Sequence, residues 1–353
     1  MRNIIDYARE EKRTFSQHGF TDVDSLVLSQ LSYLNFSELE SSHGEKEAQS
    51  LGSLLEGGGT ENLFIQAIDE KHNKAFVEAL ATSPRFSSVL LTHYVNIFEV
   101  DTEKQFSAIT YLLDDDSAYV AFRGTDASFI GWKEDFNMAF MSPVPSQQEA
   151  VEYLRRVAAV IDRPLRIGGH SKGGNLAVYA ALNSPKKLQS RCLAVYNHDG
   201  PGFHEDIYRK LCSHPLWKDV KATVPQASVI GMLLHNNMTD FTVVESRRMG
   251  IMQHDPFSWK ISDDGTFVEA RKLQADAVAF SKTVDTWLSS LDNSQRERFV
   301  DALYHVVEAT GAVTFQDLSE DLLGKIGSAL SAIKDVDGDT RDFVRSLIHE
   351  WFK

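Results

Sequence analysis

The sequence predicts an α/β protein with a mostly parallel sheet covered by helices on both faces and with helical additions at both ends. Short apolar strands alternate with amphipathic helices in the middle of the chain, whereas the first and last segments are helical and polar. A glycine-rich turn also joins one strand directly to an Ala-rich helix. Alternating strands and helices favour parallel strands because each crossover helix packs back on the sheet.

Size and composition fit a folded protein and exclude several classes of function. The chain has 353 residues, which suits about two domains or one large domain with additions. Its 36 Lys and Arg against 50 Asp and Glu give a net charge of −14, so we expect no nucleic-acid partner, because an acidic surface repels phosphates. The two cysteines exclude a disulfide framework and a Cys-based zinc site, and they favour a reducing compartment.

We expect a cytoplasmic protein without a transmembrane segment. The N-terminal sequence lacks the 7–15-residue apolar stretch of a signal peptide, and no run of about 18 uncharged apolar residues occurs. Residues 335–339 resemble a calcium loop only in part, because the glycine is fourth instead of sixth and the twelfth position is Ser346 instead of Glu. We therefore expect no metal and no cofactor. The sequence does not indicate an oligomeric state.

The chain divides into three regions. Residues 1–90 form a helical region that we expect to pack on the core, with an amphipathic helix over 22–36. Residues 91–270 form the α/β core. Residues 271–353 form a second helical region, whose amphipathic segments cover 275–291, 295–310, 315–333 and 339–352.

Strands and helices follow one another within the core region. Runs of β-branched and aromatic residues bounded by charged turns predict strands over 94–100, 106–113 and 118–122. Further along, helices are predicted over 146–161 and 175–182, and strands over 164–167, 192–196, 221–224 and 241–244. This alternation is the basis of the parallel-sheet prediction.

Residues 165–177, LRIGGHSKGGNLA, contain the strongest chemical signal. They hold a G-x-S-x-G pattern made by Gly169, Ser171 and Gly173, with an apolar strand before it and an Ala-rich helix after it. That context is typical of a nucleophile elbow, a strained turn that exposes the serine hydroxyl and has no room for bulky flanking residues. The sequence therefore predicts Ser171 as a nucleophile. A strand-to-helix turn with a capping serine is the alternative.

A serine nucleophile needs a general base at neutral pH. The candidates downstream are His198, His204, His214, His235, His254 and His305. In α/β-hydrolases the order along the chain is Ser, acid, His. We prefer His254, which lies in a loop after the last predicted strand, and we keep His235 as the rival. His204 and His305 fall in predicted helices.

The acid is predicted to be Asp199, with Asp240 as the alternative. Asp199 follows the strand over 192–196 at a turn rich in Gly and Pro, from which a carboxylate can reach a loop histidine. Asp240 precedes its strand and would need an unusual path. Asp255 adjoins His254 and cannot easily reach its neighbour's Nδ1. A turn-forming role is the plain alternative for Asp199.

An oxyanion hole needs two hydrogen-bond donors. The first is predicted to be the backbone N–H of Lys172, the residue after the nucleophile. The second is expected from residues 121–126, AFRGTD, which end a strand and include Gly124, where the backbone can approach a substrate. A bare turn at the strand end is the alternative.

Two of these motifs resemble segments of class 3 lipases. Residues 121–125, AFRGT, followed by 131–136, GWKEDF, resemble the AFRGT…W..D segment of that family. Residues 169–177, GHSKGGNLA, are similar to its G-H-S-x-G-G-x-L-A elbow. The two motifs occur in the right order, which makes them more specific together than either is alone.

Further segments resemble an uncharacterised bacterial family of lipase-like hydrolases. These are 197–203 (NHDGPGF), 228–233 (SVIGML) and 253–256 (QHDP), with Trp259. The resemblance covers roughly residues 22–260. It implies an α/β-hydrolase fold and serine ester hydrolysis, with Ser171 as nucleophile, His254 as base and Thr125 as an oxyanion donor.

The sequence departs from the class 3 pattern at two positions. The family carries its acid in a D-x-V-P segment, and Ser228 stands where that acid would be. Asp199 would then supply the acid from the preceding strand end, as in pancreatic-type lipases. Lys172 replaces the usual apolar residue of the elbow, which favours a polar or anionic acyl substrate over a lipid.

The leading hypothesis is a serine acyl-ester hydrolase, similar to lipases and esterases, acting on a small-molecule or lipid ester through a Ser171–His254–Asp199 triad and an acyl-enzyme. The alternative from another class is a catalytically silent hydrolase-fold protein that serves as a binding or scaffold module. Acyl transfer to an acceptor other than water is a third hypothesis, using the same triad.

Overall fold

A computed structural model describes most of the chain. The described residues are 2–56, 62–65, 69–99, 104–125, 134, 138, 143–234, 241–292, 295, 338 and 341. The helices predicted over 295–310, 315–333 and 339–352 therefore lie outside the described residues, apart from single positions, as does most of the calcium-like loop.

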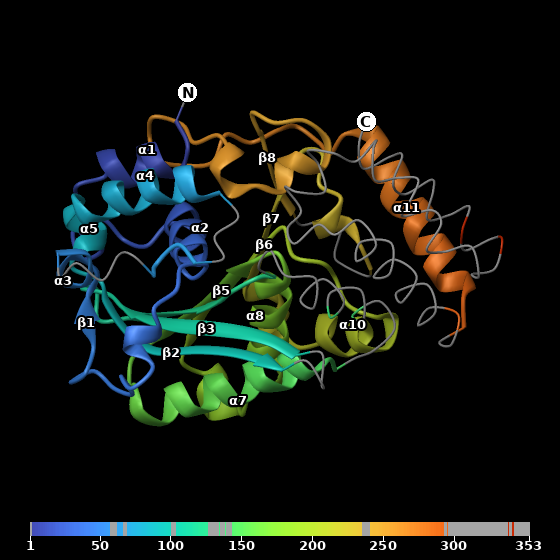
Figure 1. The fold of residues 1–353 in the computed structure, drawn as a ribbon. Helices are drawn as coiled ribbons and strands as arrows, with labels where there is room; N and C mark the ends of the chain where they lie inside the picture. The colour runs from blue at the N-terminus through green and yellow to red at the C-terminus, as the bar shows by residue number, and fades with distance from the viewer. Residues whose placement is uncertain are drawn as a thin grey trace.

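A central sheet organises the molecule (Figure 1). Within the described residues it has eight strands in sequence order. They are β1 (Gln49–Ser50), β2 (Leu90–Glu99), β3 (Lys104–Leu112), β4 (Ala118–Phe122), β5 (Leu165–His170), β6 (Cys192–His198), β7 (Val220–Pro225) and β8 (Phe241–Val244). Strands β4 to β8 are parallel, and β1 to β4 are antiparallel. The prediction of a mostly parallel α/β sheet is confirmed.

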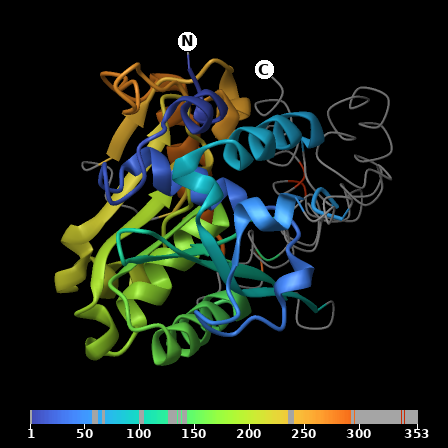
Figure 2. The same ribbon diagram turned by 90° about the vertical axis from the view of Figure 1, so that its left-hand side faces the viewer.

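Helices cover both faces of the sheet, as predicted. One face carries α1 (Ile4–Glu10), α2 (Asp22–Leu31), α4 (Glu70–Ala81) and α5 (Pro84–Ser87), and the other carries α7 (Pro145–Val160) and α8 (Lys172–Asn183). Figure 2 shows the blue and cyan N-terminal helices on the opposite side of the sheet from the green α7. The remaining helical segments are η1 (Ser37–Leu39), α3 (Leu51–Glu56), α9 (Lys186–Gln189), α10 (Glu205–Cys212), η2 (Pro215–Asp219), η3 (Ile230–Met232), η4 (Gly250–His254), η5 (Pro256–Ser258) and α11 (Ala275–Ser290).

The alternation of side chains along β4 explains why there are two cores. Tyr119 and Ala121 face the N-terminal helices, whereas Val120 and Phe122 face α7 and α8. All four side chains are fully buried. Because successive residues of a strand point to opposite faces, a strand that is apolar throughout must be covered on both sides.

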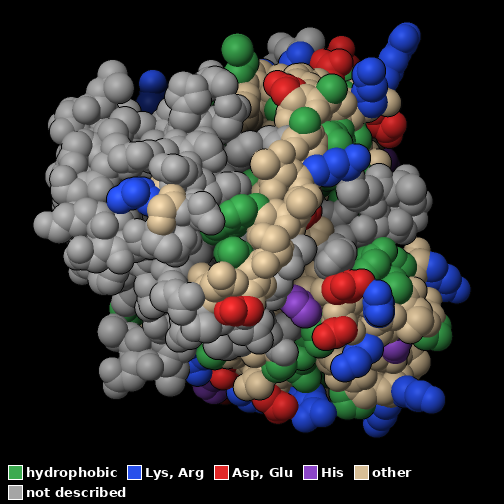
Figure 3. Space-filling view, turned by 90° about the vertical axis from the view of Figure 1, so that its right-hand side faces the viewer, with side chains coloured by type: hydrophobic (Ala, Val, Ile, Leu, Met, Phe, Trp, Pro, Cys, Tyr) green, Lys and Arg blue, Asp and Glu red, His purple; other side chains and the backbone are tan. Residues whose placement is uncertain are grey.

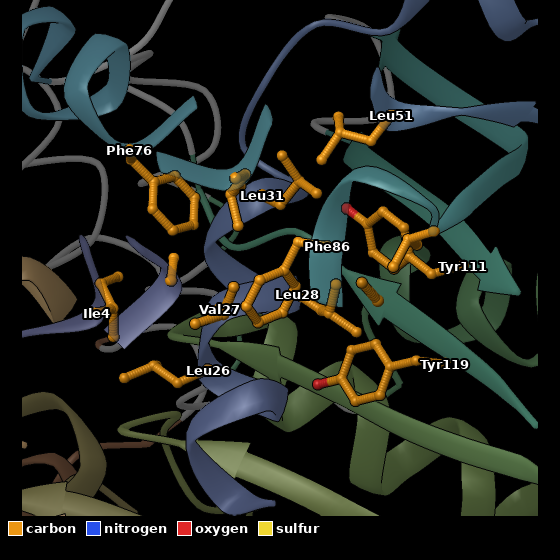
Figure 4. Close-up of a cluster of buried hydrophobic side chains, with 14 of the residues drawn as sticks. Ile4, Leu26, Val27, Leu28, Leu31, Leu51, Phe76, Phe86, Tyr111 and Tyr119 are labelled. Atoms are coloured by element: carbon orange, nitrogen blue, oxygen red, sulfur yellow. The ribbon is translucent and has the colours of Figure 1, made fainter. Parts of the chain in front are cut away.

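Helix α2 is the central element of the first core. Its residues from Val23 to Leu31 are all buried, and Leu26, Val27, Leu28 and Leu31 pack among aromatic side chains of other elements (Figure 4). The helix also buries polar side chains, such as Ser25 and Ser29, whose hydroxyls hydrogen-bond to the Tyr119 hydroxyl. The predicted helix over 22–36 is too long, because the chain turns after Leu31 and the last predicted residues pack as a loop.

A fully buried ion pair ties α2 to α5. The Arg85 guanidinium donates to both carboxylate oxygens of Asp24, at 2.6 and 2.8 Å, and neither side chain is exposed. Arg85 also donates to the carbonyls of Arg13, His18 and Gly19, so one side chain holds the loop between α1 and α2. Removing one partner of such a pair leaves a buried charge and costs about 3–5 kcal/mol.

Acidic and basic side chains are mixed on the surface, as they are in the sequence. Figure 3 shows the face on which α11 lies, where the acidic and basic side chains of the described surface are interspersed. None of the described helices combines the length and apolar character that a bilayer crossing requires.

The parallel strands bring three chain segments to one edge of the sheet. Phe122 pairs with Gly169, and His170 pairs with His198, so β4, β5 and β6 end side by side. Their next residues lead to Thr125, Ser171 and Asp199. In open α/β sheets this carboxyl edge is where sites form.

Candidate active site

Ser171 occupies a strained turn between β5 and α8. Its backbone has φ 58° and ψ −135°, a region that residues with side chains rarely adopt. Its N–H donates to the His198 carbonyl at 2.9 Å, which fixes the turn against β6. Gly169 and Gly173 approach so closely that a Cβ on either would overlap neighbouring backbone atoms. These features are those of a nucleophile elbow.

His254 and Asp199 meet at the same edge. The His254 Nδ1–H donates to Asp199 Oδ2 at 2.7 Å. The Asp199 side chain is 1% exposed and that of His254 is 26% exposed, so the carboxylate is buried behind the ring. Because a carboxylate accepts at Nδ1, Nε2 is left as the proton acceptor.

The backbone and two donors hold Asp199 in place. Its φ of 51° lies in the left-handed region, and its N–H donates to the Thr223 carbonyl at 2.8 Å. Its Oδ1 accepts a hydrogen bond from the Ser228 hydroxyl and another, at 3.2 Å, from the Gly231 N–H. Ser228, which stands where the class 3 pattern has its acid, therefore contacts the carboxylate that the neighbouring strand supplies.

His170 supports the backbone of His254. Its Nε2–H donates to the His254 carbonyl at 2.9 Å, and the two rings lie 4.5 Å apart between centroids. Its Nδ1 accepts from the Tyr33 hydroxyl at 3.1 Å. Burial, and secondarily His254, hold the pKa of His170 well below its usual range, so the ring is neutral.

The segment expected to supply the second oxyanion donor lies against the elbow. A Cβ built on Gly124 would lie 3.0 Å from the Ser171 Cβ and 2.7 Å from the His170 carbonyl, so only glycine allows this approach. Thr125, the next residue, is half-buried. The N–H groups of Thr125 and Lys172 thus belong to segments that flank Ser171.

The structure gives no support to the prediction that Lys172 favours a polar or anionic acyl substrate. The side chain is 1% exposed and is directed into the core. The ammonium donates to Glu134 Oε2 at 3.1 Å and to the Gln105 carbonyl at 3.0 Å. It is therefore no basis for choosing between acyl chains.

Three of the other candidates, His235, Asp240 and His305, lie outside the described residues. Asp255 does not contact the His254 ring; it caps η5 through the Phe257 N–H, and burial raises its pKa. 

Three further histidines lie away from the His254–Asp199 pair. His198, the last residue of β6, is buried, and its Nε2 lies 2.8 Å from the hydroxyl of Ser25 on α2. His204 precedes α10 as its N-cap instead of lying within a helix as expected. His214 accepts from the Leu216 N–H at the start of η2.

Sequence reasoning did not assign roles to the residues that contact Asp199 and His254. Ser228 and Gly231 lie in the segment 228–233, which resembles a lipase-like family, but that resemblance assigns neither residue a role. His170 lies inside the G-x-S-x-G motif, but the motif assigns a role only to the adjacent serine. Tyr33 carries no local signal, because its relation to His170 arises only when α2 packs on the sheet.

Nowhere in the described ranges do three His, Cys, Asp or Glu side chains cluster in a way that could hold a metal ion.

The fold and the site geometry define a class of protein. A mostly parallel sheet, an elbow serine and a His–Asp pair at its carboxyl edge are the features of an α/β-hydrolase. A sequence profile of the Mbeg1-like family matches residues 80–305, which is more than half of the chain. The chain belongs to the Mbeg1-like family, a lipase-like family.

Solved lipase structures show distant similarity. The lipase–propeptide complex of Rhizomucor miehei is 16% identical with a TM-score of 0.37, over 60% of this chain and 62% of that one. A fungal lipase–inhibitor complex is 13% identical with a TM-score of 0.39, over 73% and 87%. MDLA from Penicillium cyclopium is 10% identical with a TM-score of 0.39, over 72% and 87%. This chain thus spans less than two thirds of the Rhizomucor structure. No curated protein sequence matches it significantly.

Proposed function

We propose that the protein is a serine acyl-ester hydrolase that acts through Ser171, His254 and Asp199. The observation that carries the proposal is the 2.7 Å hydrogen bond from His254 Nδ1 to a buried Asp199, beside a serine in elbow geometry. That bond leaves Nε2 free to accept the serine proton. The family and the fold support a hydrolase.

The reaction proceeds in two halves. Ser171 Oγ attacks the ester carbonyl carbon while its proton passes to His254 Nε2. The tetrahedral oxyanion accepts from the N–H groups of Lys172 and Thr125, and the N-terminus of α8 adds its dipole. As the carbon–oxygen bond breaks, the leaving alcohol takes the proton from His254. Water then attacks the acyl-enzyme as it gives a proton to the same ring. The bond to Ser171 Oγ breaks, Oγ takes that proton back from His254, and the carboxylic acid leaves.

Asp199 acts on the histidine and not on the substrate. A carboxylate that accepts from Nδ1 holds the ring in the productive tautomer and stabilises the imidazolium that forms after proton transfer. The alternative of a catalytically silent scaffold rested on the missing acid at Ser228. The Asp199–His254 hydrogen bond removes that reason.

Hydrolysis of a nitrophenyl-ester chain-length series by wild type and Ser171→Ala tests the proposal. Loss of a triad member costs about 10⁴–10⁶ in kcat, so we expect the variant to lose nearly all activity while it remains folded. A purified, folded Ser171→Ala that kept more than about a tenth of wild-type turnover would show that Ser171 is not the nucleophile. The series also measures the preferred acyl length.

A further inference from the structure

The side chain of Lys172 is an unusual feature of this elbow. Lys172 directly follows the nucleophile, and its ammonium is buried in an ion pair with Glu134, whose side chain is not exposed at all. The same ammonium donates to the Gln105 carbonyl on β3. The reaction proposed above uses only the backbone N–H of Lys172, so the role of this side chain is unassigned.

Glu134 uses both carboxylate oxygens. Oε2 accepts from the Lys172 ammonium and from the Gln105 N–H, each at 3.1 Å. Oε1 accepts from the Ser146 N–H at 3.0 Å, in the first turn of α7. The ion pair therefore joins the first residue of α8 to the start of β3 and to the start of α7.

Stability alone is a weak reason for such a pair. Taking two charges out of water costs about as much as their attraction returns, and well-packed apolar side chains of similar volume often serve equally well. What a buried pair with these directional bonds provides is a fixed position for the backbone that carries it. At Lys172 that backbone includes the first proposed oxyanion donor.

The second donor depends on the same packing. A Cβ on Gly173 would lie only 2.9 Å from the Arg123 carbonyl carbon, so the first turn of α8 rests directly on the strand end that leads to Thr125. A small shift of the start of α8 would change the separation of the two N–H groups. Misplacing a catalytic group by about 1 Å can cost about 10²-fold in rate.

We propose that the Lys172–Glu134 ion pair is a positioning device that sets the geometry of the oxyanion hole. This inference rests on the proposed function. Lys172 contributes to catalysis through its backbone N–H, while its side chain and Glu134 are positioning groups that do not touch the substrate. The pair is neutral as a whole, so it aligns the donors without adding net charge beside the oxyanion.

The double variant Lys172→Met/Glu134→Gln tests the inference, since it removes both charges with little change of volume. Its kcat and KM for a nitrophenyl ester are measured together with the inhibition constant of a trifluoromethyl ketone carrying the same acyl chain. The ketone forms a tetrahedral oxyanion on the serine and so reports the hole directly. We expect kcat to fall about 10- to 100-fold with KM nearly unchanged, and the inhibition constant to rise in parallel.

The matched control is Asp24→Asn/Arg85→Met, which removes a pair that is equally buried but lies between α2 and α5. We expect this control to lose thermal stability and to keep kcat within about twofold at a temperature where it is folded, because its site geometry is intact. The contrast separates positioning from general destabilisation. Should the first double variant not fold, Glu134→Asp carries the test, because it keeps both charges but shortens the reach of the carboxylate, and we expect a smaller loss of kcat and of ketone affinity in the same direction.

A folded Lys172→Met/Glu134→Gln that kept wild-type kcat and ketone affinity would overturn the inference and leave the proposed function standing. A wild-type protein inert toward both the esters and the ketone would overturn the proposed function. The inference would fall with it, because the pair would then have no oxyanion to serve.

Discussion

At the scale of single residues, the proposed mechanism makes Asp199 the acid that orients His254. We predict that Asp199→Asn loses about 10⁴ in kcat, because an amide can present its NH₂ to Nδ1 and stabilise the wrong tautomer of His254. Asp240→Asn should remain near wild type. Both variants are compared by kcat on the best nitrophenyl ester, with circular dichroism to confirm folding.

The same exchange separates the catalytic role of Asp199 from a purely structural one. Asn serves in tight turns as Asp does, so a turn-forming Asp199 would tolerate the change. A crippled Asp240→Asn beside a normal Asp199→Asn would assign the acid to the segment before β8. If neither change mattered, the site would act as a Ser–His dyad.

Replacing Ser228 should lower kcat less than replacing Asp199. Its hydroxyl donates to the Asp199 carboxylate, which also accepts from the Gly231 N–H. Losing one neutral donor to a charged group is worth about 1.5–3 kcal/mol at most, so Ser228→Ala should lower kcat by roughly tenfold and leave KM unchanged. Ser246→Ala, at another buried serine away from Asp199, is the control. An unchanged kcat in Ser228→Ala would show that Gly231 suffices.

The residues of the candidate triad could be named from the sequence, but their supports could not. Ser171 lies in a motif whose flanking strand and helix can be read locally, and Asp199 and His254 follow from chain order and strand ends. Ser228, His170 and Tyr33 act across segments that are far apart in the sequence. Their contacts exist only after the sheet is assembled.

At the scale of elements, α11 is linked to the segment that supports the acid. The Ser281 hydroxyl donates to the Met232 carbonyl at 2.6 Å, and Asp285 Oδ1 accepts from the Leu234 N–H at 2.9 Å. Leu234 has a φ of 64°, a strained value for a leucine. This segment includes Gly231, which donates to Asp199.

We therefore predict that Ser281→Ala/Asp285→Ala lowers kcat several-fold, because loss of both bonds relaxes the segment beside Asp199. Thr283→Ala, at an exposed position of the same helix, should leave kcat unchanged. Steady-state kinetics on the nitrophenyl ester measures both. A chain of residues 1–270 that was fully soluble and fully active would instead make the C-terminal region an independent appendage.

Helices and strands could be predicted where the spacing of apolar residues was clearly periodic. The strands β2 to β8 and helix α7 fall within a few residues of their predicted positions, because alternating or helical apolar patterns mark them. The end of α2 was not predictable, since Leu34 and Phe36 continue the apolar pattern and are buried although they lie outside the helix. Strand β1 has only two residues and carries no pattern.

At the scale of the whole molecule, buried histidines make the fold sensitive to acid. Burial lowers the pKa of His198 to about 3 and that of His93 to about 4, and it holds the pKa of His170 well below its usual range. In the unfolded chain each has a pKa near 6.5. The unfolded state therefore binds more protons below that pH, so stability is complete above about pH 6.5 and falls as the pH decreases.

In this window, each such histidine lowers the free energy of unfolding by about 1.4 kcal/mol for each pH unit of acidification. The three together lower it by about 4 kcal/mol per pH unit. We predict a steep loss of the free energy of unfolding between about pH 6 and 4, measured by urea unfolding at several pH values. His198→Gln, which cannot be protonated, should reduce the slope by about one third. An unchanged slope would show that His198 is protonated in the folded state.

The central claim is that Ser171 is a nucleophile activated by His254 and Asp199. Reaction with a fluorophosphonate probe, followed by peptide mapping of the adduct, tests this claim most directly, because the probe phosphonylates only an activated hydroxyl. We predict one adduct, on Ser171, that is absent from Ser171→Ala and forms far more slowly in Asp199→Asn. An unreactive wild type, or an adduct on another residue that persists in Ser171→Ala, would contradict the account.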